Sequence, residues 1–162
     1  MAISGVRTYL WFDDQALDAA EFYVGLFPDA RITSVSHYRE GAGKPAGTVL
    51  VVEFKIFGQP FAALNGGPEF PHSEAVSFQV GCDTQDELDR LWDALIADGG
   101  SESRCGWCRD RFGISWQVVP HALGELLASG DPAVAQRAWQ AMMGMSRIVI
   151  AELSAAPEGE SA

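Results

Sequence analysis

The sequence predicts an α+β protein in which two βαβββ modules are followed by C-terminal helices. Strand-like and helix-like segments follow one another in the same order in residues 3–67 and, in shortened form, in residues 73–120. Both modules also open with an aromatic-bearing strand and finish with a Phe-Gly pair that leads into a last strand. Repetition of one element order within a chain is typical of an internally duplicated fold.

In the first module, four short segments are rich in β-branched and aromatic side chains, which predicts strands. These segments are residues 7–12, 30–38, 48–57 and 61–65. Between the first two, apolar residues recur at helical spacing from Ala16 to Phe27, and Pro28 stops the helix. Asp13 and Asp14 offer N-caps for this helix. The predicted order is therefore βαβββ.

The second module begins with a strand-like segment, residues 75–80. Thr84 and Glu87 then have the spacing of a capping box, in which the side chain of each residue accepts a hydrogen bond from the backbone amide of the other. A helix with an apolar stripe follows, and residues 114–120 form the last strand. The stretch between helix and last strand is about fifteen residues shorter than in the first module, so we expect an abbreviated copy.

Residues 121–153 are predicted to form a C-terminal helical extension, and residues 154–162 a frayed tail. Within the extension, Asp131 is placed as an N-cap, with Pro132 at the first helical position. A chain of 162 residues with 48% hydrophobic residues can bury a substantial core, and we expect residues 1–162 to form a single domain.

The composition argues against several classes of function. The formal net charge of −11 opposes nucleic-acid binding, because polyanions are repelled. The most apolar run, TVLVVEFKIF, is broken by Glu53 and Lys55, so no membrane span is expected. We expect a cytoplasmic protein, since the N-terminus lacks the pattern of a signal peptide and the three cysteines do not suggest a disulfide framework.

Several segments together resemble the PhnB-like branch of the vicinal oxygen chelate superfamily, which includes glyoxalase, bleomycin-resistance and extradiol dioxygenase proteins. The segments that carry the resemblance are LWFDDQALDAAEFYVGLFPDARI, FAALNGGPEF, EAVSFQV, CGWCRDRFGISWQVVP and AMMGMSRIVIAEL. The resemblance implies a barrel-like curved mixed sheet with helices outside, a small-molecule ligand in a cleft, and a homodimer. Members of this branch are often described as ubiquinone methyltransferases. The sequence contains no G-x-G-x-x-G that follows a strand, so we do not expect a site for a methyl donor.

The resemblance and the alternation of side chains along strands select one face of each strand as the cleft. The expected cleft residues are Thr8, Leu10, Phe12, Phe61, Ala63, Asn65, Ala75, Ser77, Gln79, Ser115 and Gln117. Relatives that use a metal carry its ligands at four of these positions, namely Thr8, Ala63, Ala75 and Gln117. None of these four residues is a His, Asp or Glu, so we expect neither a metal nor another cofactor.

The leading hypothesis is a protein that binds a small organic molecule without a metal. In the simpler alternative, the polar cleft residues pair with one another and no ligand binds. A second alternative is a glyoxalase-like lyase or oxygenase-type metalloenzyme, with Glu53 as a candidate general base and Glu69 as another nearby acid. A third is a thiol redox protein using the C-x-x-C pair Cys105 and Cys108, although these precede a strand instead of opening a helix.

Overall fold

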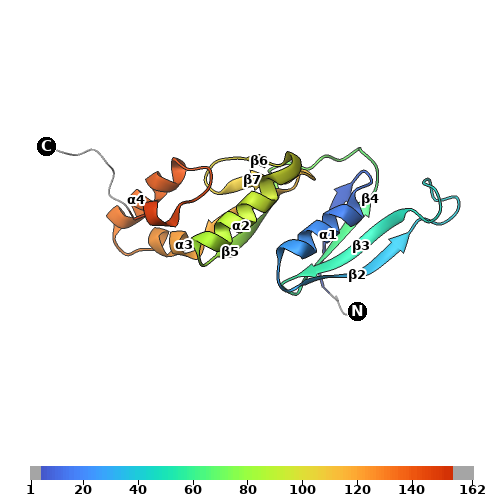
Figure 1. Ribbon diagram of the computed structural model, residues 1–162, viewed down its shortest axis with the longest axis horizontal. Helices are drawn as coiled ribbons and strands as arrows, with labels where there is room; N and C mark the ends of the chain where they lie inside the picture. The colour runs from blue at the N-terminus through green and yellow to red at the C-terminus, as the bar shows by residue number, and fades with distance from the viewer. Residues whose placement is uncertain (1–4, 155–162) are drawn as a thin grey trace. The chain divides into compact units, whose positions relative to one another are not determined.

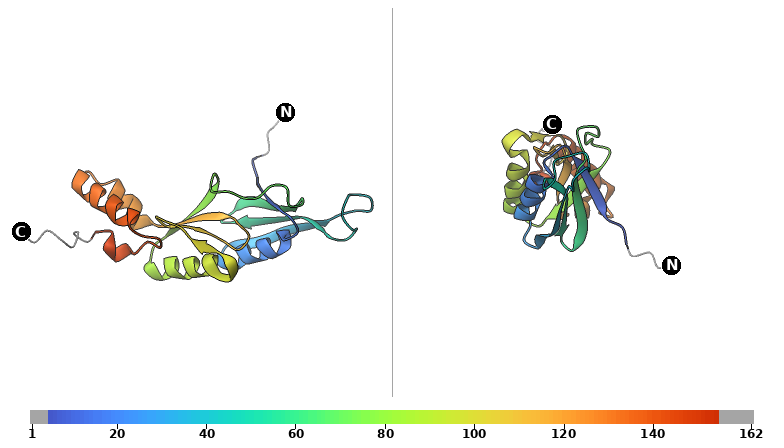
Figure 2. Two further views of the ribbon diagram at one scale, coloured as in Figure 1. Left: turned by 90° about the horizontal axis from the view of Figure 1, so that it is seen from above. Right: turned by 90° about the vertical axis from the view of Figure 1, so that its right-hand side faces the viewer.

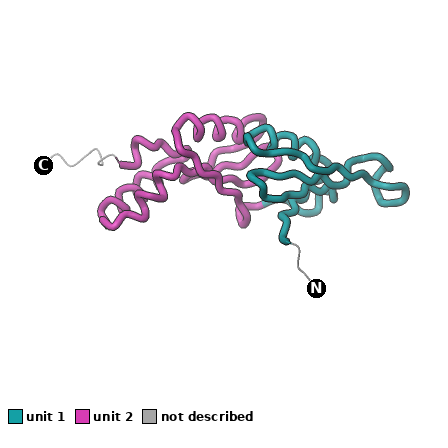
Figure 3. Tube along the Cα trace, turned by 90° about the horizontal axis from the view of Figure 1, so that it is seen from below, with its two compact units in different colours: residues 1–72 teal, residues 73–162 magenta. Residues whose placement is uncertain are grey.

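The structure is a computed structural model that describes residues 5–154 (Figures 1 and 2). The chain divides into two compact units, residues 1–72 and residues 73–162 (Figure 3). Each unit contains its own four-stranded mixed sheet, and the strands of the described residues pair only within these two sheets. The α+β class and the two βαβββ modules are confirmed, with the strands in two separate curved sheets and not in one closed barrel.

The first unit has the element order βαβββ. Its elements are β1 (Thr8–Phe12), α1 (Ala16–Leu26), β2 (Ala30–His37), β3 (Val49–Ile56) and β4 (Gln59–Asn65). The spatial order of the strands is β1-β4-β3-β2, with β1 and β4 parallel and the other neighbours antiparallel. Helix α1 covers one face of this sheet (Figure 1).

The buried face of helix α1 combines small residues in its first two turns with larger ones further along. Ala16, Ala19 and Ala20 are fully buried, and Tyr23 stacks in a tilted arrangement on Phe54 of β3, with 6.1 Å between ring centroids. The expected N-caps Asp13 and Asp14 are a wrong prediction, because the N-cap residue is Gln15, whose side chain makes no capping bond. A distant side chain supplies the missing acceptor.

The second unit repeats the order with shorter middle strands. Its elements are β5 (Ser77–Cys82), α2 (Gln85–Ile96), the 3₁₀ turn η1 (Ala97–Gly99), β6 (Ser101–Glu102), β7 (Trp107–Arg109) and β8 (Ser115–Pro120). The spatial order is β5-β8-β7-β6, with β5 and β8 parallel. The abbreviation is confirmed, since β6 and β7 have 2 and 3 residues where β2 and β3 have 8 each.

Helix α2 lies along one face of the second sheet (Figures 1 and 2). Its capping box is confirmed: Thr84 accepts from the Glu87 amide, while the Glu87 carboxylate accepts from the backbone amides of Thr84 and Asp83. These bonds to the ionised carboxylate lower the pKa of Glu87. The sequence signal and the structure agree here because a capping box is complete within one turn.

After β8, the chain adds α3 (His121–Leu127), α4 (Pro132–Met143) and the 3₁₀ turn η2 (Ile150–Glu152). Asp131 caps α4 as predicted, accepting from the Ala133 amide at 2.9 Å. The segment after α4 runs beside the β6–β7 connection, where the Cys105 amide donates to the Met145 carbonyl at 2.7 Å. Among residues 5–154, no helix combines the length and hydropathy needed to cross a bilayer, and the predicted tail lies almost wholly outside the described residues.

Candidate functional site

The face of the second sheet that α2 covers is identified by one row of paired residues. Glu102 pairs with Cys108, Cys108 with Trp116, and Trp116 with Phe78 across four neighbouring strands. The indole nitrogen of Trp92 on α2 approaches the Glu102 carboxylate at 3.4 Å, which places this row on the α2 side. Residues at the alternate positions therefore point to the opposite face.

We call this opposite face the polar face. It consists of Ser77, Gln79, Ser101, Trp107, Arg109, Ser115 and Gln117. Within it, Arg109 is paired with Ser115 and with Ser101, and Trp107 is paired with Gln117. The face carries hydroxyls, amides, one guanidinium and one indole, and no carboxylate.

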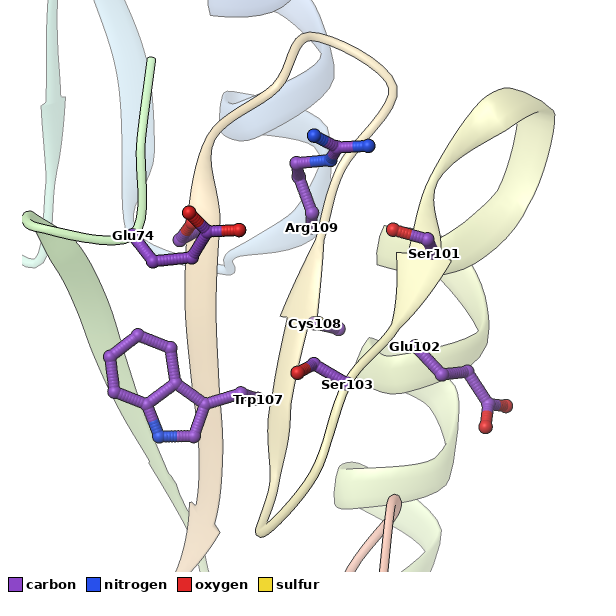
Figure 4. Close-up of a pocket in the computed structure, with 8 residues that line it drawn as sticks. Glu74, Ser101, Glu102, Ser103, Trp107, Cys108 and Arg109 are labelled. Carbon is purple, nitrogen blue, oxygen red and sulfur yellow. The ribbon is translucent and has the colours of Figure 1, made fainter.

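A pocket of about 200 Å³ opens at the β6–β7–β8 part of the second unit (Figure 4). Its lining residues are Glu74, Ser101, Glu102, Ser103, Trp107, Cys108, Arg109 and Ser115. In Figure 4, Trp107 extends from β7 to the side where Glu74 lies, Arg109 extends toward the turn between β7 and β8, and Glu102 extends toward α2. The groups able to contact a ligand from the polar face are therefore Arg109, Trp107 and the serine hydroxyls, with Glu74 beside them.

Ser115 is the unusual member of the lining. The residue is 2% exposed, and its buried Oγ has no hydrogen-bond partner. Its neighbours on the polar face behave differently, since Gln117 Nε2 donates to Ser77 Oγ at 2.8 Å. Buried hydroxyls are normally hydrogen-bonded, so the unpaired Ser115 Oγ is an exception that needs an explanation.

The structure brings together four of the predicted cleft residues in the second module: Ser77, Gln79, Ser115 and Gln117 lie on the polar face. Ala75 does not join them, because β5 begins two residues later and Ala75 lies in the turn before it. The alternative in which polar residues pair with one another applies to Ser77 and Gln117 but not to Ser115.

The predicted cleft residues of the first module face the other way, which corrects the expected orientation of Thr8, Leu10, Phe12, Phe61, Ala63 and Asn65. The register pairs Ala63 with Val52 and Phe61 with Phe54, the residues that pack under α1. In the parallel pair of β1 and β4, Leu10 lies beside Ala63 and Phe12 beside Asn65, so Leu10 and Phe12 share this buried face. The alternation failed here because RTYLWF and FAALN carry apolar side chains at both parities.

Asn65 shows the consequence most directly. Its Oδ1 accepts from the Ala16 amide at 2.8 Å, and its Nδ2 donates to the Val49 carbonyl at 3.1 Å. This side chain therefore caps α1 from 49 positions further along the chain. Asn65 holds the first unit together, and its amide is already used.

Glu53, the candidate general base, forms an ion pair with Arg7 in the first unit. The Glu53 carboxylate is therefore already engaged in a contact within the first unit. Within residues 5–154, no three His, Cys, Asp or Glu side chains gather as metal ligands would. The expected absence of a metal remains a prediction.

The Cys105-x-x-Cys108 motif forms a turn into β7. Cys105 and Gly106 both have left-handed backbone angles, with φ of 58° and 81°, and a side chain at position 106 would lie 2.8 Å from the Val118 carbonyl. Burial, followed by the nearby carboxylates of Asp110 and Glu102, raises the pKa of Cys108 to about 12. Cys105 Sγ lies 3.6 Å from Met143 Sδ, and all three cysteines are free thiols. A thiol with so high a pKa is a poor redox nucleophile.

Six residues of the pocket were not predicted from the sequence: Glu74, Ser101, Glu102, Ser103, Trp107 and Arg109. The available signal was the alternation in the segment WCR, where Cys108 is apolar and buried and its two neighbours point to the opposite face. A strand of 3 residues is too short for alternation to be recognised without its partner strand.

Comparisons with known proteins agree with this architecture. The family model described as 3-demethylubiquinone-9 3-methyltransferase matches residues 4–119. The PhnB protein of Bacillus cereus is 31% identical with a TM-score of 0.65, over 71% of this chain and 98% of that one. Protein PA1353 of Pseudomonas aeruginosa is 21% identical with a TM-score of 0.57, over 71% and 96%. No curated protein matches the sequence.

More distant structures share the fold alone. The fosfomycin resistance protein FosX of Listeria monocytogenes is 15% identical with a TM-score of 0.51, over 72% of this chain and 92% of that one. The family match ends at residue 119, so the helical extension lies beyond it. The chain belongs to the PhnB-like family described as 3-demethylubiquinone-9 3-methyltransferase.

Proposed function

We propose that this protein binds a small organic molecule in the pocket on the polar face of its second unit, without a metal. The observation that carries the proposal is the Ser115 hydroxyl, which is buried in the pocket wall with no partner. Leaving a buried hydroxyl unpaired costs about 1–3 kcal/mol, and a ligand atom that bonds to it offsets this cost.

The size and chemistry of the pocket support the same proposal. A volume of about 200 Å³ is below the ~300–1,000 Å³ that drug-sized ligands occupy, which favours a small molecule. Trp107 offers a flat apolar surface, and Ser101, Ser103 and Ser115 offer hydrogen bonds. A few polar groups beside an aromatic wall are typical of sites that bind small ligands.

The alternatives have less support in the described residues. A metalloenzyme of the glyoxalase or oxygenase type needs converging ligands, and residues 5–154 contain no such group. A redox protein needs a reactive thiol pair, and the pKa of Cys108 is raised to about 12. The family description names a methyltransferase, for which the sequence offers no glycine-rich dinucleotide-type loop.

We further propose a cytoplasmic homodimer. Strand β2 is at the edge of its sheet and most of its residues are exposed, so its outer backbone groups are available to a partner chain. Sedimentation equilibrium tests this part of the proposal, and a monomer at micromolar concentration would contradict it.

A fragment screen by NMR tests ligand binding directly. Fragments of 6 to 12 heavy atoms should shift the amide resonances of Trp107, Arg109 and Ser115 in the presence of EDTA. Ser101→Trp should fill the pocket from the edge strand β6 and abolish these shifts. Gln136→Trp, at an exposed position of α4 outside the pocket lining, is the control and should leave the shifts intact.

Two results would contradict the proposal. The first is a screen in which no fragment shifts the pocket amides at millimolar concentration, or in which the shifts persist in Ser101→Trp. The second is protein purified without chelator that retains one equivalent of a divalent metal and loses fragment binding when the metal is removed.

A further inference from the structure

The pocket has a chemical bias that goes beyond its size. Resting on the proposed function, we propose that the ligand is a small organic acid. Its carboxylate is bound jointly by the Arg109 guanidinium and the Ser115 hydroxyl, while its apolar body lies against the Trp107 indole. This assignment names two specificity-determining residues and the chemical class that they select.

The first step is the proximity of the two groups. Arg109 of β7 and Ser115 of β8 are directly paired across the antiparallel ladder, and both point to the polar face. The Cβ atoms of residues paired in this way are about 4.5–5.5 Å apart. One carboxylate placed over this pair can therefore accept from both side chains.

The second step is that both groups lack a partner within residues 5–154. The Arg109 guanidinium makes no hydrogen bond or ion pair with the described residues, whereas the guanidinium groups of Arg7, Arg111 and Arg147 are all paired with acids. The Ser115 Oγ is likewise unpaired and is almost fully buried. A guanidinium has a planar fork of donors that matches the two oxygens of a carboxylate, and a serine hydroxyl can donate to the same group.

The third step concerns the two acids that line the pocket. Glu102 belongs to the α2 side, where it faces Trp92, so it does not neutralise Arg109. Glu74 also lines the pocket, and among the described residues it forms no ion pair with Arg109. Glu74 would repel an acid placed next to it, so the proposal requires the ligand's carboxylate to bind Arg109 on the side away from the Glu74 carboxylate.

The net charge makes the inference selective. A chain with a formal net charge of −11 attracts no anion through its overall field. If an acid binds more tightly than its uncharged analogue, the preference must therefore come from groups within the pocket. Nonspecific association with the negatively charged chain would favour the uncharged analogue.

The test compares benzoate with benzamide, which has nearly the same shape but no charge. Titrations followed by the amide resonances of Trp107, Arg109 and Ser115 give both dissociation constants. We expect benzoate to bind at least tenfold more tightly than benzamide. Arg109→Gln should remove this preference, whereas Arg31→Gln, an exposed arginine of the first unit, should preserve it. Glu74→Gln should tighten benzoate binding by a few fold.

The possible results separate this inference from the proposed function. If benzamide binds the pocket as well as benzoate does, or if Arg109→Gln leaves the ratio unchanged, the acid assignment is overturned and the small-molecule site stands. If neither these probes nor the fragment library shifts the pocket amides, both proposals are overturned. A tenfold preference that depends on Arg109 and weakens in Ser115→Ala supports the inference.

Discussion

Asp110 Oδ2 accepts a hydrogen bond of 2.8 Å from the indole nitrogen of Trp116 within the second unit. The other carboxylate oxygen accepts from the backbone amides of Phe112 and Ile114, at 2.9 and 3.0 Å. Asp110 is 1% exposed, so one buried carboxylate organises both the turn between β7 and β8 and the packing of the α2-facing row. This turn joins the two strands in which Arg109 and Ser115 are paired.

Asp110→Asn should lower the free energy of unfolding by about 2–4 kcal/mol. The amide replaces one acceptor oxygen with an NH₂ donor that faces N–H donors, and hydrogen bonds to a charged group are the stronger class. Urea denaturation measures the effect. Asp98→Asn, which removes an exposed partner of Arg111, is the control and should cost under about 1 kcal/mol. Equal effects of the two substitutions would show that Asp110 is not the organising group.

Ser115→Ala should increase stability and reduce ligand affinity at the same time. Removing a buried hydroxyl that has no partner relieves its desolvation cost, so unfolding should require about 1 kcal/mol more. Ser77→Ala, which deletes the acceptor for Gln117, should instead destabilise by about 1 kcal/mol. Thermal unfolding of the two variants side by side checks the sign. A loss of stability in Ser115→Ala would indicate that its hydroxyl has a structural role.

The Cys108 thiol should make the protein less stable at alkaline pH. Burial raises the pKa of Cys108 from 9.0 to about 12, so the unfolded chain loses this proton first as the pH rises. The contribution is fully present below about pH 9 and is lost between about pH 9 and 12, with a slope of at most about 1.4 kcal/mol per pH unit.

Urea unfolding at several pH values between 8 and 11 measures this slope, and Cys108→Ala serves as the reference because other groups titrate in the same range. The wild-type protein should lose stability more steeply than the variant. Parallel curves would contradict the prediction, whatever the difference in absolute stability at pH 8.

Gln85→Ala should detach the end of the helical extension from α2. Gln85 Nε2 donates to the Ile148 carbonyl at 3.1 Å, and its Oε1 accepts from the Ile150 amide at 2.8 Å. Losing both bonds should cost about 1–3 kcal/mol and increase hydrogen exchange at the Ile150 amide. Gln79→Ala is the matched control, because Gln79 is exposed on β5. Unchanged protection of the Ile150 amide in Gln85→Ala would refute the role assigned to this side chain.

The second module was the more predictable of the two because its strands alternate in polarity. In AVSFQV and ISWQVV the polar residues occupy one parity, and the structure places Ser77, Gln79, Ser115 and Gln117 on one face of the sheet. In the first module both parities are apolar, so the packing of α1 decides which face is buried. The expected orientation of Phe61 and Asn65 failed for that reason.

By itself, the sequence determined the order of helices and strands, the duplication, the capping box at Thr84 and the cap at Asp131. These features depend on periodicities and bonds that are complete within a few residues of the chain. Only the tertiary structure decided that Asn65 caps α1, that Asp110 holds Trp116 and that Arg109 lies beside the unpaired Ser115 hydroxyl. Such relationships arise when strand register joins distant segments, and no local pattern in the chain encodes which residues then become neighbours.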